Sequence, residues 1–266
     1  MNGRPAATER TPAAAGSFYP SDPAELASTV DALLETTLAP ADVGEILALV
    51  VPHAGYVFSG PVAASAYALL RGHEIGRVAL LGPAHFVPLR GTAVPRADTW
   101  RTPLGALGID AELRAIAVDT GAVVDDAPHE PEHALEVQLP FLQRVLGEPA
   151  ILPIAVGLAQ PGPVADLVAA LLPHALVVVS TDLSHYHEQR TAERLDRRTA
   201  DAVLARDADA IGPEDACGSY ALRGLVELAR REDLPIRLLD LRTSADTAGD
   251  PWRVVGYGAF VVEDSG

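Results

Sequence analysis

Four polar side chains that follow closely on apolar runs could do chemistry: His53, His85, Asp182 and His185. Neutral imidazoles with a carboxylate nearby can bind a borderline divalent metal ion and leave positions open for a substrate. A histidine, whose ordinary pKa is about 6.5, can also act as a general acid or base near neutral pH. The residue types therefore predict metal binding, acid–base catalysis or both.

The apolar runs that precede these side chains read as buried β-strands. They are short and continuous rather than alternating, which is typical of a sheet covered on both faces. The predicted strands are residues 45–51, 77–81, 150–156, 175–179 and 253–262. Because ligands of open α/β sheets bind outside the carboxyl ends of the strands, the side chains that follow three of these strands should converge at one sheet edge.

Amphipathic segments alternate with the strands and predict helices. They are residues 22–38, 61–70, 110–118, 132–146, 163–172, 187–206 and 215–231. This alternation indicates an α/β fold, a three-layer sandwich with a mostly parallel or mixed central sheet between helices. We expect a flexible tail over residues 1–14 and a single domain over residues 15–266, with a small β insertion around residues 92–107.

A further group of candidates lies in the segment 129–136. Glu132 is interpreted as a helix cap, because acidic side chains are favoured at helix N-termini. His133 and Glu136 are three residues apart and share a helix face, and both a structural and a catalytic role stay open for His133. His129 is interpreted as a solvated loop residue.

Cys217 is the one cysteine of the chain and stands at the start of the last predicted helix. A helix N-terminus lowers the pKa of a thiol and favours the thiolate, which is a nucleophile and a soft metal ligand. The alternative is a small buried apolar residue, the usual role of a free cysteine.

The composition excludes several classes of protein. All 20 basic residues are arginine, so a lysine Schiff base and a Walker-type phosphate loop are absent. One cysteine excludes an intrachain disulfide and a CxxC redox pair. A formal charge of −16 argues against nucleic acid as a partner. No apolar run approaches the roughly 20 residues that span a bilayer, and the N-terminus lacks the apolar core of a secretory signal, so we expect a cytoplasmic protein without a membrane partner.

Several motifs, spread in order over nearly the whole chain, resemble those of the Memo family, whose bacterial and archaeal members are often called AmmeMemoRadiSam system protein B. They are AGSFYP (15–20), PHAGYVFSG (52–60), LGPAHF (81–86), EHALEVQLPFLQ (132–143), STDLSHY (180–186), ACG (216–218) and VVGYGAF (254–260). The combination is far more specific than any one of the motifs. After the Cys-Gly step the family usually continues with Gly-Pro or His-Pro, whereas Ser219, Tyr220 and Ala221 follow here.

The resemblance implies a fold similar to that of the class III extradiol (LigB-type) dioxygenases, which are non-haem iron enzymes. It implies a metal site formed by His53, His85 and Cys217, with Fe(II) or copper as the ion. Asp182, His185 and His133 match the polar residues that line the family's pocket, and they are the candidates for acid–base catalysis.

These expectations leave three functions open. The first is a metal-dependent redox protein that uses Fe(II), or otherwise copper. The second is a binding or scaffold protein without catalysis, which would hold a peptide or small molecule in the same pocket. The third is a zinc-dependent hydrolase. The family resemblance also implies a functional link to radical-SAM and AMMECR-type proteins.

Overall fold

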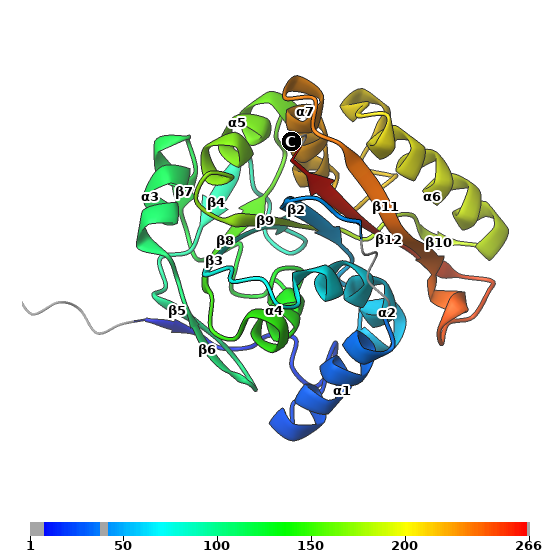
Figure 1. Cartoon of the computed structure of the whole chain (residues 1–266), viewed down its shortest axis with the longest axis horizontal. Coiled ribbons are helices and arrows are strands. Elements are labelled where there is room, and N and C mark those ends of the chain that lie inside the picture. Colours follow the sequence, from blue (N-terminus) through cyan, green and yellow to red (C-terminus); the bar gives the residue numbers. More distant parts are fainter. Residues whose placement is uncertain (1–7, 38–41, 265–266) are drawn as a thin grey trace, which may run out of the picture.

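The centre of the molecule is a mixed β-sheet (Figure 1). The computed structural model describes residues 8–37 and 42–264. Within them, four strands pair in parallel at the middle of the sheet, in the order β2 (Ile46–Val51), β9 (Leu176–Ser180), β3 (Arg77–Pro83) and β8 (Ala150–Val156). These are four of the five predicted strands, and their continuous apolar sequences are buried from both sides.

Shorter or antiparallel strands extend the sheet on both sides. The long C-terminal strand β12 (Val254–Glu263) is antiparallel to β2. It also pairs in antiparallel fashion with β10 (His185–His187) and β11 (Ile236–Thr243). At the other edge, β4 (Thr92–Val94) is antiparallel to β8 and parallel to β7 (Val123–Val124). The predicted fifth strand is β12, whereas β10, β11 and β7 were not predicted.

Helices cover both faces of the sheet and form two separate apolar cores (Figure 1). One face is covered by α1 (Pro23–Glu35), α2 (Tyr56–Tyr67) and α4 (Leu139–Leu146). The other is covered by α3 (Ala111–Asp119), α5 (Pro161–Leu171), α6 (Gln189–Leu204) and α7 (Ser219–Arg231). Short 3₁₀ segments complete the described elements: Ala68–Leu70, Glu136–Gln138, Ala208–Ala210 and Ser244–Asp246. The α/β sandwich prediction is confirmed.

Residues 8–14 are part of the fold rather than a tail. Strand β1 (Glu9–Arg10) pairs with β5 (Thr99–Thr102), which forms a hairpin with β6 (Gly105–Gly108) in the predicted β insertion. Residues 1–7 of the predicted tail lie outside the described residues. For residues 8–14 the prediction is wrong, because Arg10 is buried and holds the chain against the segment 129–136.

The segment 132–146 is not one continuous helix. Turns lead into the 3₁₀ segment Glu136–Gln138, and α4 begins at Leu139. Glu132 therefore caps no helix. Its carboxylate binds the backbone N–H groups of His133 and Ala134, both at 2.9 Å, and this contact holds the turn in place of a helical first turn.

No helix in the described part of the chain combines the length and the apolar character that crossing a bilayer requires. This agrees with the lack of a long apolar run in the sequence.

Candidate metal centre

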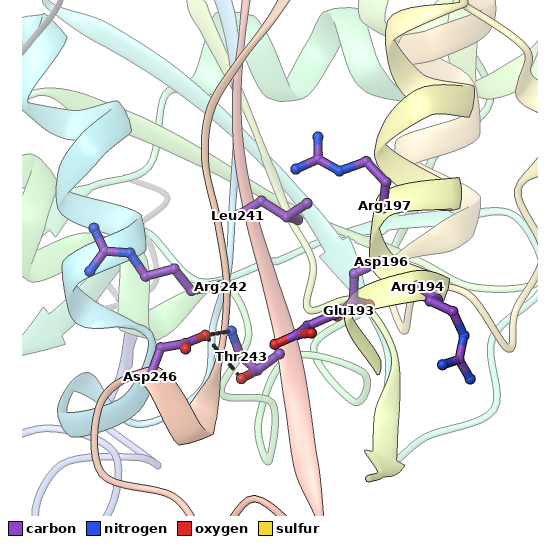
Figure 2. A pocket seen from close by; sticks show the side chains of 8 residues that line it. All are labelled: Glu193, Arg194, Asp196, Arg197, Leu241, Arg242, Thr243 and Asp246. Atoms are coloured by element: carbon purple, nitrogen blue, oxygen red, sulfur yellow. Dashed lines mark hydrogen bonds between the residues drawn. The ribbon is translucent and has the colours of Figure 1, made fainter. Parts of the chain in front are cut away.

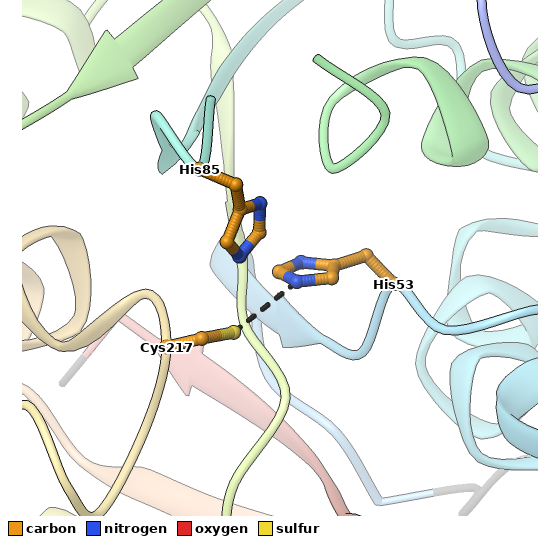
Figure 3. Close-up of side chains that lie close together, drawn as sticks. All are labelled: His53, His85 and Cys217. Carbon is orange, nitrogen blue, oxygen red and sulfur yellow. Dashed lines mark hydrogen bonds between the residues drawn. The ribbon is translucent and has the colours of Figure 1, made fainter. Parts of the chain in front are cut away.

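Three side chains from distant parts of the chain meet at the carboxyl edge of the parallel strands. His53 follows β2, His85 follows β3, and Cys217 lies two residues before α7. One nitrogen of each imidazole and the Cys217 sulfur all lie within 4.8 Å of one another. Figure 3 shows the two rings and the thiol directed toward a common point. The structure brings His53 and His85, which the strand-end rule predicted to converge, together with Cys217, which comes from the loop before α7 rather than from a strand end.

His53 is almost fully buried, and both of its ring nitrogens have partners. Nδ1 lies 2.9 Å from the Ser180 hydroxyl, and Nε2 lies 3.2 Å from the Cys217 sulfur. Burial, together with the neighbouring His85, lowers the pKa of His53 to about 3. The ring is therefore neutral at physiological pH, and a neutral imidazole is the form that binds metal ions.

His85 is fixed by one carboxylate at two points. Its backbone N–H donates to Glu132 Oε2 at 2.6 Å, and its Nδ1 lies 3.0 Å from Glu132 Oε1. Burial alone would raise the pKa of Glu132, but its hydrogen bonds to His85 and Ala134 lower that pKa to about 2. A carboxylate on Nδ1 fixes the ring orientation and leaves Nε2 for a metal ion, an arrangement common around metal-binding histidines.

Cys217 lies beside His53 but does not behave as a thiol at a helix N-terminus. Its sulfur accepts a hydrogen bond from the Asp182 backbone N–H at 3.3 Å. Burial and the Asp182 carboxylate raise the pKa of Cys217 to about 12. The expected lowering of this pKa by the helix is wrong, because burial and the Asp182 carboxylate decide the direction of the shift. A metal cation at this position would stabilise the thiolate directly.

The departure from the family pattern after Cys217 leaves the thiol in place. Ser219, Tyr220 and Ala221 form the first turn of α7, and the Cys217 sulfur remains 3.2 Å from His53 Nε2.

Asp182 lies next to the trio, and its carboxylate is held by the first strand-end loop. Oδ1 accepts the His53 backbone N–H at 2.7 Å, and Oδ2 lies 4.0 Å from His53 Nε2. Burial raises the pKa of Asp182 above its usual value. His185, the third candidate histidine from the strand ends, lines the same cavity.

His133 stacks on the outer side of His85. The two ring centres are 5.0 Å apart with an angle of 17° between the planes, and Phe18 packs on His133 at 4.3 Å. Burial and the nearby His53 lower the pKa of His133 to about 4. His85, Glu132 and His133 form a second group with metal-ligand atoms. The Glu132 oxygens already accept four hydrogen bonds, so we interpret Glu132 and His133 as residues that hold the His85 ring in position rather than as a second metal site.

All six predicted site residues line one cavity of about 830 Å³. Aromatic side chains form much of its wall: Phe18, Phe58, Tyr186 and Tyr257. The guanidinium of Arg253 lies 4.3 Å from the Tyr186 ring centre, and Tyr186 has a positive φ of 64°, a backbone conformation that costs energy for a large side chain. The cavity thus combines a candidate metal site with space for an organic ligand.

A second cavity of similar volume lies between α6 and β11, and it contains none of the predicted site residues (Figure 2). Its lining alternates acidic and arginine side chains. Asp196 is the buried one among these charged side chains, and Asp246 closes a short turn by accepting hydrogen bonds from the Thr243 backbone and hydroxyl.

The residues that hold the candidate metal ligands in position could not be recognised from the sequence. Ser180 contacts His53 Nδ1, and Gln138 donates to the Ser180 hydroxyl at 2.8 Å. Glu132 was interpreted only as a cap. Ser180 and Gln138 stand inside the motifs STDLSHY and EHALEVQLPFLQ, so the motifs were the available signal, but their pairing across 42 residues is a property of the fold.

His129 is buried rather than solvated. Its Nε2 lies 3.1 Å from the Ala93 carbonyl, and its ring packs edge-on against Trp100. The prediction failed because the covering residue belongs to the β5–β6 hairpin, which a local reading of the sequence around Pro131 does not include.

Comparison with known proteins shows to which family the chain belongs. The family model described as Memo-like protein matches residues 10–261. The chain belongs to the Memo family. A MEMO1 family protein of Methanopyrus kandleri is 33% identical, over 95% of this chain and 98% of its own length. One from Thermotoga maritima is 35% identical over 94% and 98%, and one from Nitrosopumilus maritimus is 32% identical over 94% and 98%. This Memo family member therefore matches its relatives over almost their entire length.

Proposed function

We propose that this Memo family member is a redox protein with one Fe(II) or copper ion bound by His53, His85 and Cys217. The observation that supports this proposal best is that the three side chains are held in place with their ligand atoms directed to one point. Ser180 binds Nδ1 of His53 and Glu132 binds Nδ1 of His85, so both rings are fixed beside the Cys217 sulfur. Three converging ligands on a rigid sheet edge are what a mononuclear site with open positions requires.

The donor set favours particular metals. Two imidazoles suit iron, copper and zinc, whereas a thiolate favours softer ions over Mg²⁺ and Ca²⁺. The thiolate also differs from the carboxylate of the usual 2-His-1-carboxylate triad. Bound there, iron or copper would supply electron-transfer or O₂ chemistry that side chains alone do not perform.

Around this site the polar side chains would handle protons. Asp182, with a pKa raised by burial, and His185 and His133 line the cavity beside the proposed metal position. A proton released by a bound substrate could pass to any of the three without reaching bulk water, the role expected of a general acid or base. Phe18 and Phe58 form part of the wall of the same cavity.

The test is metal analysis of protein purified without chelator, once in air and once under anaerobic conditions. We expect a stoichiometry near one iron or copper per chain, lost in His53→Ala and His85→Ala. His174→Ala is the matched control, because His174 is exposed and follows α5 at a distance from the site. Metal-free wild-type protein in both preparations, or full occupancy of the two variants, contradicts the proposal.

The same measurement separates the other functions. Zinc alone, with no change of spectrum on oxidation or reduction, favours a hydrolase with metal-activated water. A metal-free protein whose cavity of about 830 Å³ binds a peptide or small molecule favours the binding function, for which the aromatic wall is the supporting observation.

A further inference from the structure

Arg10 is a buried arginine outside the residues that surround the proposed metal. Its side chain is 6% exposed, and its guanidinium carbon lies 4.2 Å from the Trp100 ring centre. The parallel register of β1 with β5 sets Arg10 opposite Trp100. A buried guanidinium is strongly destabilising unless hydrogen-bond acceptors surround it. The residues that supply these acceptors are therefore held close to Arg10.

The acceptors of the Arg10 guanidinium all belong to the segment 129–136. Nε donates to the His129 carbonyl at 2.7 Å, and Nη2 donates to the Glu132 carbonyl at 2.5 Å. Nη1 donates to the Glu136 carboxylate at 2.7 Å. One planar side chain thus fixes three points of a segment that lies more than 115 residues away in the sequence.

This segment also fixes the proposed metal ligands. The carbonyl of Glu132 is bound by Arg10, and the carboxylate of the same residue binds His85 at Nδ1 and at the backbone N–H. Two residues past Glu136, Gln138 donates to the Ser180 hydroxyl, which contacts Nδ1 of His53. The path from Arg10 to His85 therefore passes through a single residue.

The backbone of this segment is held by single turns rather than by a continuous helix, for example by the Glu132 N–H, which donates to the His129 carbonyl at 3.3 Å. Regular helical hydrogen bonding begins only with the 3₁₀ segment Glu136–Gln138, and residues 125–135 are loop and turns. A lysine could not replace Arg10, because the fixed fork of a guanidinium matches several acceptors at once, whereas an ammonium is a point charge on a flexible stem. Arg10 therefore fixes the backbone position of Glu132 through the hydrogen bond to its carbonyl.

We propose that Arg10 is a positioning residue of the metal centre, which acts by holding Glu132 in the place from which its carboxylate orients His85. The inference rests on the proposed function, since it assigns a role toward the same metal site. It gives the N-terminal segment, predicted as a tail, a part in metal binding. Glu132 connects the two, because Arg10 binds its carbonyl and its carboxylate binds His85.

The test uses Co(II) as a spectroscopic probe on anaerobic, metal-free, full-length protein. Absorption reports the Co(II) geometry and the sulfur ligand, competition with a chelator gives the affinity, and thermal unfolding of the metal-free form reports the fold. We expect Arg10→Met to weaken Co(II) binding by about tenfold or more and to alter the spectrum, the usual size of an outer-shell effect. Arg10→Lys should bind only slightly better than Arg10→Met.

Two comparisons keep the result interpretable. Glu9→Gln removes the exposed ion pair with Arg101 from the same strand, and it should leave Co(II) binding unchanged. Arg10→Met leaves Glu136 buried without its cation, and this could prevent folding. In that case the double variant Arg10→Met/Glu136→Gln, which also removes the Glu136 charge, is measured instead of Arg10→Met.

The route through Glu132 is tested by a double-mutant cycle. Arg10→Met should weaken Co(II) binding in the wild-type background but add less than twofold to Glu132→Gln. Additive losses overturn the route, and unchanged affinity and spectrum in a folded Arg10 variant overturn the inference while the metal site stands. A wild-type protein that binds no metal overturns the proposed function itself, and with it this inference.

Discussion

Both oxygens of the Glu132 carboxylate are directed at His85: Oε2 accepts the backbone N–H at 2.6 Å, and Oε1 faces Nδ1 at 3.0 Å. Glu132 is fully buried, and its negative charge is supported by further N–H groups from His133 and Ala134. The carboxylate therefore fixes the position of the loop and the rotation of the ring together. This double contact leads to the first prediction.

Glu132→Gln should weaken metal binding by about 10- to 100-fold, because an amide nitrogen cannot accept the hydrogen bonds that one of the oxygens now accepts. Isothermal titration with Co(II) or Zn(II) measures the change. Glu130→Gln is the control, since Glu130 is exposed and lies in the same loop. An affinity equal to that of wild type would show that the carboxylate does not orient His85.

Cys217→Ser should discriminate between metals. A hydroxyl is a harder ligand than a thiolate, so we expect a loss of Cu(I) affinity of more than about 100-fold and a smaller loss for Zn(II). Competition against a chromophoric Cu(I) chelator measures the first value, and a zinc indicator measures the second. Equal affinities for Cu(I) in wild type and variant would remove Cys217 from the ligand set.

Gly218→Ala should disturb the site by steric pressure. A Cβ atom at this position would lie 2.7 Å from the Ser180 carbonyl oxygen and 2.7 Å from Thr181 Cβ. Neither atom can move freely at the end of β9, so we expect a loss of about 1–3 kcal/mol in the free energy of unfolding and weaker metal binding at Cys217. Urea unfolding measures the loss. Gly76→Ala, with no atom within 4 Å of its Cβ, should be close to neutral.

Asp196→Asn should change how stability depends on pH. Asp196 accepts the Ser184 backbone N–H at 2.9 Å, and burial raises its pKa to about 6. Between the unfolded pKa near 4 and this value, the folded state keeps a proton that the unfolded state loses, so the wild type loses stability as pH rises through this window. Asparagine avoids this cost while keeping an acceptor for Ser184.

We therefore expect Asp196→Asn to match the wild type near pH 4 and to exceed it by about 1–3 kcal/mol above pH 7. Denaturant unfolding of the metal-free proteins across this range gives the difference. Asp201→Asn, an exposed position on the same helix, is the control. A stability difference that is constant between pH 4 and pH 7 would contradict the raised pKa.

Strand prediction succeeded where the sequence is uniform and failed where it is mixed. The predicted segments 45–51 and 150–156 match β2 and β8 within one residue. Strand β11 (Ile236–Thr243) mixes polar and apolar side chains and is half-buried over most of its length, so it lacks the continuous apolar signal of a central strand. The sequence thus located the parallel centre of the sheet better than its flank.

Site prediction shows a similar division. His53 and His85 followed from the position of each at a strand end, because that rule depends only on local sequence and sheet geometry. Glu132 could not be recognised, since its partner His85 is 47 residues away and an acidic residue before an apolar segment also fits a helix cap. The local sequence indicates which side chains could bind a metal ion, whereas the orientation of these side chains depends on contacts between distant segments.

The distance along the chain between the proposed ligands has a consequence for biosynthesis. His53 and Cys217 are separated by 164 residues, yet their side chains are 3.2 Å apart. A growing polypeptide has no complete site until most of it has left the ribosome and the central sheet has assembled. The metal of the proposed function would then be acquired after folding rather than serve as a nucleus for it.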